Sequence, residues 1–129
     1  MSYAAEREAI ETRFAAAWTA TPIAWDNVDF TPPEGPWVRL HIVNGEAFQA
    51  SMGSPVLVRH PGLIQIEINT PAGIGSGTAM TLADQACAIF RFALFDGIVC
   101  RSASKQRLID REGWSVALVE IPFQRDEFF

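Results

Sequence analysis

Apolar and polar residues alternate from Leu63 to Asn69, which is the pattern of a β-strand with one buried face. Three isoleucines share one face, and Leu63 shares the other with the polar side chains of Gln65, Glu67 and Asn69. The isoleucine face is expected to pack on a core, and the other face is expected to be mainly polar.

A long apolar helix is predicted after this strand and a glycine-rich loop, from Ala79 to Asp96, with Thr78 as N-cap and Gly97 as C-terminal stop. Residues at helical spacing form a stripe suited to packing on a sheet: Leu82, Ala86, Ile89, Phe90 and Ala93. Met80, Cys87, Leu94 and Phe95 fall largely outside it. Such a helix needs cover on more than one side, either from a neighbouring subunit or from the chain's own sheet and N-terminal helix.

The N-terminal segment predicts an amphipathic helix from Ser2 to about Thr19, because Ile10, Phe14 and Trp18 recur at helical spacing. Further strands are expected at residues 23–28, 37–43, 46–52, 56–60, 98–101 and 114–123, with Leu108 and Ile109 adding a short edge strand. Asn44-Gly45 and Pro61-Gly62 indicate two hairpin turns. Residues 31–36 read as an exposed proline-rich loop, and residues 102–106 as a polar connection.

The order of these elements defines the expected architecture. No internal repeat or linker divides the chain, so residues 1–129 are expected to form a single domain. The fold class is α+β, with a mixed, mainly antiparallel β-sheet and two helices packed on one face.

The composition and charge of the chain argue against several classes of protein. Hydrophobic residues make up 49% of the chain and charged residues 19%, which is typical of a globular domain and not of a disordered one. No apolar run reaches the roughly 18 residues of a membrane span, and the charged N-terminus does not resemble a secretory signal, so synthesis and folding in the cytoplasm are expected. The net charge of −5 and the scattered basic residues argue against sequence-specific nucleic-acid binding.

Candidate chemistry is sparse. Cys87 and Cys100 are expected to be buried reduced thiols, and His41 and His60 stand without neighbours at metal-ligand spacing. The glycines between residues 73 and 77 lack the lysine of a phosphate loop and the spacing of a dinucleotide fingerprint. No nucleophile elbow or paired-carboxylate pattern is present. The chain is therefore expected not to be an enzyme and to need no cofactor or metal.

Several short segments, taken in order, resemble the tail terminator or tail completion proteins of long-tailed bacteriophages and prophages, which are minor tail proteins. The resemblance covers nearly the whole chain, and none of its segments is a catalytic signature. The segments are Trp25-Asp26-Asn27, Pro32-Pro33, Trp37-Val38-Arg39, His60-Pro61-Gly62, Ile66-Glu67-Ile68, Pro71-Ala72-Gly73 to Gly77, Leu82-Ala83-Asp84, Phe90-Arg91, and Trp114 to Ile121-Pro122-Phe123.

The resemblance implies a small α+β structural protein that forms a ring, usually of six subunits, and caps the last ring of the tail tube. Such a ring stops tube polymerisation and provides the docking surface for the head connector. The implied partners are copies of the chain itself, the tail tube protein and the head–tail connector. The implied location is the virion tail, after synthesis and assembly in the cytoplasm of the bacterial host.

Two sets of contact residues are hypothesised on this basis. The second helix and its glycine loop are expected to form subunit contacts, through Gly73, Gly75, Gly77, Met80, Cys87, Arg91, Phe95 and Arg101. The loop at residues 30–36 and the C-terminal segment at residues 124–129 are expected to contact the tube or connector, through Pro32, Pro33, Arg125, Phe128 and Phe129. For the terminal aromatics, fraying or packing back on the sheet is the alternative.

Two other functions remain open from the sequence. The first is another phage neck or head-completion component, which would differ in the ring that it meets. The second is a small α+β ligand-binding protein or enzyme that forms a dimer around a pocket, with residues 73–77 at its lip.

Overall fold

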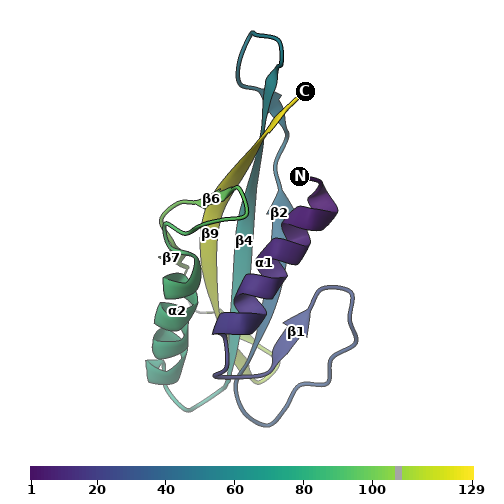
Figure 1. The fold of residues 1–129 in the computed structure, drawn as a ribbon. Coiled ribbons are helices and arrows are strands. Elements are labelled where there is room, and N and C mark those ends of the chain that lie inside the picture. The colour runs from purple at the N-terminus through teal and green to yellow at the C-terminus, as the bar shows by residue number, and fades with distance from the viewer. Residues whose placement is uncertain (107–108) are drawn as a thin grey trace.

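The computed structural model of the chain describes residues 1–106 and 109–129. Its elements are, in chain order, α1 (Tyr3–Ala17), β1 (Ile23–Trp25), β2 (Trp37–Asn44), β3 (Phe48–Gln49), β4 (Leu57–Pro71), α2 (Gly77–Phe90), β5 (Leu94–Phe95), β6 (Ile98–Cys100), β7 (Ser104–Lys105), β8 (Ile109–Arg111) and β9 (Trp114–Phe128). In the described residues, two helices lie on one face of a nine-stranded sheet (Figure 1). The predicted α+β class is confirmed.

The sheet is built around one long ribbon. The strand order is β1-β2-β4-β9-β6-β5, with β3 beside β4 and with β7 and β8 beside β9. Only the β1–β2 pair is parallel among the described pairs. Strands β4 and β9 pair along all 15 residues of each, which spans roughly 50 Å.

The ribbon is longer than the helices that cover it. Helix α1 has 15 residues and is therefore about 22 Å long. One end of the ribbon extends past both helices, together with the loop that precedes β4 (Figure 1). We call this end the arm and define it as β3, residues 50–59 and residues 126–129.

The core lies between the ribbon and the two helices. Ile64, Ile66 and Ile68 are fully buried on the helix side of β4, as their alternation predicts. Both helices present their predicted stripes to this face, through Ile10 and Phe14 of α1 with Trp18 just after it, and through Leu82, Ala86 and Phe90 of α2. The rings of Phe14 and Phe90 stack with their centroids 6.1 Å apart, which joins the two helices.

Helix α2 is shorter than predicted and begins earlier. It starts at Gly77 after Ser76, so the expected Thr78 cap is wrong, and it ends at Phe90 instead of Asp96. The segment that follows folds into a β5–β6 hairpin, whose turn consists of Asp96 at φ 47° and Gly97 at φ 79°. An Asp-Gly pair between apolar residues favours such a turn, and this local preference ends the helical pattern.

The Asn44-Gly45 hairpin prediction is wrong. Strand β2 pairs with β4, and β3 follows β2 along the same side of β4. The amide of Gly45 donates to the carbonyl of Pro61, so the chain continues along the ribbon at this point. The long complementary surface of β4 determines the pairing in place of the local turn signal.

Pro61-Gly62 is also not a turn. Both residues lie inside β4, opposite Gln124 and Phe123 of β9. A Cβ atom on Gly62 would lie 2.3 Å from Cζ of Phe123, so this glycine permits the close approach of an aromatic ring. The predicted strands at residues 56–60 and 63–69 are therefore one strand.

The remaining strands differ from expectation mainly in length. The predicted strand at 23–28 ends at Trp25, and the final strand continues past Phe123 to Phe128. The connection at 102–106 contains the short strand β7, and Ile109 begins the edge strand β8. The other half of that prediction, Leu108, lies outside the described residues.

Candidate assembly surfaces

The arm carries exposed apolar side chains. Met52 is 98% exposed, and Phe48, Phe128 and Phe129 are at least half exposed. Phe129 is nevertheless held in place, because its amide and carbonyl both bond with Val56. The arm is thus an ordered projection with an apolar tip, which is typical of an interaction surface.

An ion pair crosses the arm. Arg59 donates from Nε and Nη2 to the two carboxylate oxygens of Asp126, at 2.9 and 3.0 Å. This hydrogen bonding lowers the pKa of Asp126 below its ordinary value. Phe48 of β3 lies beside Arg59 in the ladder, so the pair and the aromatic ring occupy one face of the arm.

A second exposed apolar group lies at the edge of the sheet that β5 forms. We call it the β5 edge and define it as residues 91–95 and Val99. Leu94 is 74% exposed and Phe92 is 70% exposed. Phe92 also has a positive φ of 53°, a backbone conformation that is common for glycine and rare for a bulky residue. Arg91, next to it, is also exposed.

The opposite edge of the sheet is open beyond β1. Strand β1 pairs with β2 only as far as Trp25 and Leu40. The amide of Val38 donates to Pro22, so the even-numbered residues of β2 direct their backbone groups outward, and Ile42 and Asn44 follow in this alternation. Within residues 1–106 and 109–129, this part of β2 pairs with β4 on one side and with no strand on the other side. We call it the β2 edge (residues 41–45).

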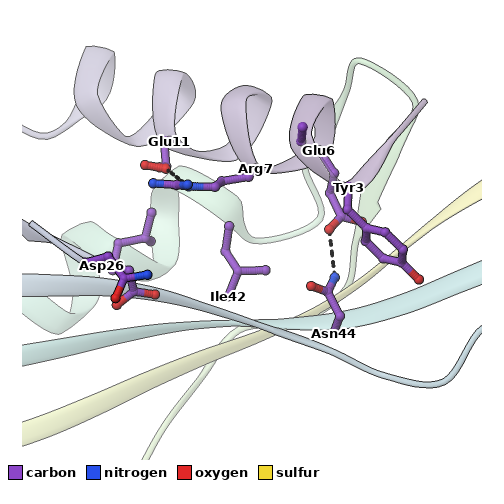
Figure 2. A pocket seen from close by; sticks show the side chains of 10 residues that line it. Tyr3, Glu6, Arg7, Glu11, Asp26, Ile42 and Asn44 are labelled. Atoms are coloured by element: carbon purple, nitrogen blue, oxygen red, sulfur yellow. Dashed lines mark hydrogen bonds and ion pairs between the residues drawn. The ribbon is translucent and has the colours of Figure 1, made fainter.

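A cavity of about 340 Å³ lies between the β2 edge and α1 (Figure 2). Its apolar lining includes Leu40 and Ile42, and its polar lining consists of Tyr3, Glu6, Arg7, Glu11, Asp26, Asn27 and Asn44. Its carboxylates already have partners: Glu11 pairs with Arg7, Asp26 with His41, and Glu6 with Asn44 and Arg125.

A buried charge network ties α1 to the arm end of the ribbon. Arg125 donates from Nε to Glu6 at 2.8 Å and from Nη1 to Glu127 at 2.6 Å. Asn44 donates to the second oxygen of Glu6, also at 2.8 Å. The hydrogen bond from Arg125 is the main cause that lowers the pKa of Glu127. The network places the first turn of α1 over β2 and β9, and this turn forms one wall of the cavity.

A groove of about 620 Å³ runs between the two helices, and its apolar lining consists of four alanines, Ile89 and Phe95. Arg13 closes one side of it, because its Nε donates to the carbonyl of Ile89 and its guanidinium lies 4.8 Å from the centroid of the Phe95 ring. Phe95 is therefore engaged within the subunit.

The sheet face opposite the helices carries an aromatic cluster. Trp37 packs on Phe30 and Trp114, with centroids 5.0 and 5.9 Å away. Phe30 anchors the loop that contains Pro32 and Pro33, of which Pro32 is exposed and Pro33 half-buried. Trp37 is itself buried.

The structure separates the hypothesised subunit-contact residues. Gly73 and Gly75 lie in an exposed loop and Gly77 begins α2, and a Cβ added to any of them would meet no atom within 4 Å. Met80, Arg91 and Arg101 are exposed, and Arg101 donates to Gln124. Cys87 is buried in the core, so the expectation that it faces a neighbour is wrong.

The hypothesised partner-contact residues also divide. Phe128 and Phe129 are exposed on the arm, but Arg125 is 2% exposed and bonded to Glu6, so it is not available to a partner. The sequence shows only a charged stretch there. The continuation of β9 turns alternate residues of that stretch toward α1.

Several exposed apolar residues do not stand out in the sequence. Phe48 and Met52 fall in a segment with the pattern of an ordinary strand, and Phe92 and Leu94 fall in the predicted helix. The Asp96-Gly97 pair is the signal that could have identified the β5 edge.

The described residues offer little catalytic or metal-binding chemistry. No group of three potential metal-ligating side chains occurs in residues 1–106 and 109–129. Both cysteines are free and buried, and burial raises the pKa of the Cys100 thiol to about 11. Neither helix in the described part of the chain is long and apolar enough to cross a membrane.

These features define an open-sheet α+β domain with its helices on one face and apolar groups at separate exposed sites. The family model described as "Phage tail terminator protein" matches residues 6–123. The chain therefore belongs to the phage tail terminator family. One solved structure, whose name states no function, is 25% identical with a TM-score of 0.74, and the match covers 100% of this chain and 98% of the other. The search of curated proteins finds no match.

The family is one of structural phage tail proteins. Because the chain belongs to this family, it has a role in phage tail completion. In this role the protein is part of the virion tail and interacts with other tail or head components.

Proposed function

We propose that six copies of this chain form a ring that caps the last ring of the tail tube, stops tube polymerisation and presents the docking surface for the head connector. The observation that supports this most directly is the presence of two separate exposed apolar groups on one small domain, at the arm and at the β5 edge. A contact between different surfaces of identical subunits generates a ring when its rotation closes.

The two ends of the ribbon suit two different partners. The arm lies at one end of β4, and β4 leads at its other end into the exposed loop with Gly73 and Gly75. The loop with Pro32 and Pro33 precedes β2 at that same end. One end is proposed to meet the tube and the other the connector.

The residues proposed for these contacts follow from their exposure. Gly73, Gly75, Gly77, Met80, Arg91, Phe95 and Arg101 remain proposed for subunit contacts, with Phe95 contributing only its outer part. Pro32, Pro33, Phe128 and Phe129 remain proposed for the tube or connector. The protein is proposed to be encoded by an active phage or a prophage, and to be made and assembled in the cytoplasm of the host.

A ligand-binding role is the weaker alternative. The carboxylates that line the cavity in Figure 2 are already paired, Glu11 with Arg7, Asp26 with His41 and Glu6 with Arg125, so a small ligand would have to compete with existing ion pairs. Another neck or head-completion role differs from the proposal only in the ring that the protein meets.

A tube-capping assay tests the proposal. Purified tail tube protein would be allowed to polymerise with increasing amounts of this chain, and tube lengths would be measured by negative-stain electron microscopy. We expect shorter tubes, each with extra density at one end, and native mass spectrometry is expected to show six-subunit species. Unchanged tube lengths with no end density would contradict the proposal.

A further inference from the structure

The β5 edge and the β2 edge lie at opposite sides of one sheet, and their strands run in the same direction. Successive antiparallel pairs connect β2 to β4, β4 to β9, β9 to β6 and β6 to β5. Four reversals restore the direction, so β5 is parallel to β2. If identical subunits are related by rotation about an axis along the strands, β5 of one subunit meets β2 of the next as a parallel neighbour.

The two edges also lie at the same height along the strands. A single row of facing residues crosses the sheet from the β2 edge to the β5 edge: Val43 faces Leu63, and Leu63 faces Pro122. The row continues through hydrogen bonds from the amide of Arg101 to the carbonyl of Pro122 and from the amide of Phe92 to the carbonyl of Arg101. An edge-to-edge contact at this height needs no displacement along the strand axis. Such a contact closes into a ring, whereas a displaced contact would propagate as a helical filament.

Unpaired backbone groups are available on both edges. Ile42 and Asn44 direct theirs away from β4. On the other edge, Ala93 accepts from Cys100 and Phe95 pairs with Ile98, so the N–H and C=O of Leu94 point outward. Strand β1 already pairs in parallel with the preceding part of β2. The β5 strand of a neighbouring subunit would pair in the same direction with the next part of β2, directly after β1.

Side chains on the two edges are complementary. Phe92, Leu94 and Val43 are all exposed apolar residues that this contact would cover. Arg91 immediately precedes Phe92, and Phe92 lies in the same row as Val43 of β2. Asp26 immediately follows Trp25, and Trp25 pairs with Leu40 of β2. Both charged residues therefore fall at about the same position along β2, between Leu40 and Val43. Arg91 of one subunit would therefore arrive beside Asp26 of the next, with Glu11 close by in the same cavity.

We propose that the β5 edge of one subunit adds in parallel to the β2 edge of the next, with Arg91 facing Asp26, so that the sheets of neighbouring subunits become continuous around the ring. This inference rests on the proposed ring, and it specifies the contact that closes it. It also explains why a bulky, conformationally restricted residue such as Phe92 is left exposed.

Cysteine cross-linking tests the contact directly. Val43→Cys and Leu94→Cys would be combined in one chain and treated with a short bismaleimide, while the native Cys87 and Cys100 are buried. We expect a ladder of covalent species that ends at the six-subunit product on denaturing gels. A mixture of the two single variants should stop at the dimer, because each chain then carries only one of the two sites.

The matched control is Leu94→Cys combined with Ile74→Cys, which is also exposed but lies on the glycine loop. A ladder from this control would place the glycine loop against the β5 edge and overturn the proposal. The absence of a ladder from the Val43 and Leu94 pair overturns the edge contact. If native mass spectrometry still shows rings, the proposed ring-forming function stands without this edge contact. If rings are absent in solution and also at the ends of tail tubes, both the edge contact and the proposed function fail.

A charge exchange provides a second test that does not depend on cross-linking. Arg91→Glu and Asp26→Arg should each reduce ring formation at least tenfold, and the double variant should restore most of it. The thermal midpoints of the variants would show whether the monomers remain folded. Assembly that is unaffected by both single changes, or is not restored by the double change, would contradict the pairing.

Discussion

Arg125 and Glu6 form a buried ion pair between the last part of β9 and the first turn of α1, with Nε and Oε1 2.8 Å apart. Both side chains are at most 2% exposed. The pair joins residues 119 positions apart in sequence and fixes the end of α1 on the ribbon. It therefore positions the helix that forms one wall of the edge cavity.

Replacement of Arg125 by methionine should destabilise the fold by about 3–5 kcal/mol, because Glu6 would remain buried without its cation. The double variant Arg125→Met with Glu6→Leu should recover much of this loss. Urea unfolding at pH 7 measures both. Arg59→Met is the matched control, since its pair with Asp126 is partly exposed and its loss should destabilise the fold far less than the loss of Arg125. Equal losses at both arginines would contradict the interpretation.

Replacement of Gly62 by alanine should cost about 1–3 kcal/mol, because its Cβ would collide with the buried ring of Phe123. Combining it with Phe123→Leu should cost less than the sum of the two single changes. Thermal unfolding followed by circular dichroism would report this coupling. Gly35→Ala, where no atom lies within 4 Å of the added carbon, should be close to neutral.

The buried Cys100 thiol should make stability depend on alkaline pH. Burial raises its pKa from 9.0 to about 11, so the unfolded chain loses this proton first. The contribution is complete below pH 9 and is lost as the pH rises from 9 to 11, by on the order of 1–2 kcal/mol once solvent screening is allowed for. The difference in unfolding free energy between the wild type and Cys100→Ala should shrink accordingly between about pH 8 and pH 11. A constant difference would show that the thiol does not ionise on unfolding.

The Asp126 carboxyl should titrate below its ordinary value. Its hydrogen bonds from Arg59 lower the pKa, so any stability that it contributes is present above pH 3.8 and is lost as the pH falls through the lower folded-state value. An NMR titration of the aspartate carboxyl carbons measures this pKa. In Arg59→Gln the pKa should rise toward its ordinary value, and an unchanged pKa would remove the ion pair as its cause.

The arm tip should matter for capping and not for folding. Phe128→Ser and Met52→Ser change exposed side chains, so they should alter stability by less than about 0.5 kcal/mol. On the proposed function, they should weaken the shortening of tail tubes in the capping assay. Val28→Ser, which is 55% exposed and lies away from the arm, provides the control. Full capping by the Phe128 and Met52 variants would remove the arm from the contact.

Periodicity predicts the buried residues better than it predicts the connections between strands. The isoleucines of β4 and the stripe of α1 face the core as expected, because alternation and helical spacing follow directly from backbone geometry. The two predicted hairpins are wrong because Asn44-Gly45 and Pro61-Gly62 are local signals, whereas pairing depends on the whole length of β4. The absence of Gln124–Phe128 from the predicted strand has the same cause.

The predicted contact residues show the same limit. Exposure at Arg91, Phe128 and Phe129 agrees with the hypothesis, but Cys87 and Arg125 are buried by elements that are distant in sequence. The β2 edge could not be recognised from the chain alone, because it exists only where β1 stops short of the end of β2.

Local spacing and residue type are enough to predict the α+β class, the amphipathic first helix, the apolar second helix, the buried face of the central strand and the resemblance to tail terminators. The folded chain is needed to show which strands pair, that the ribbon continues into an arm and that Glu6 and Arg125 meet in the interior. It is also needed to show that the open β2 and β5 edges lie in one row at opposite sides of the sheet. These features depend on contacts between distant segments, and such contacts are selected by the total surface that the folded chain can bury.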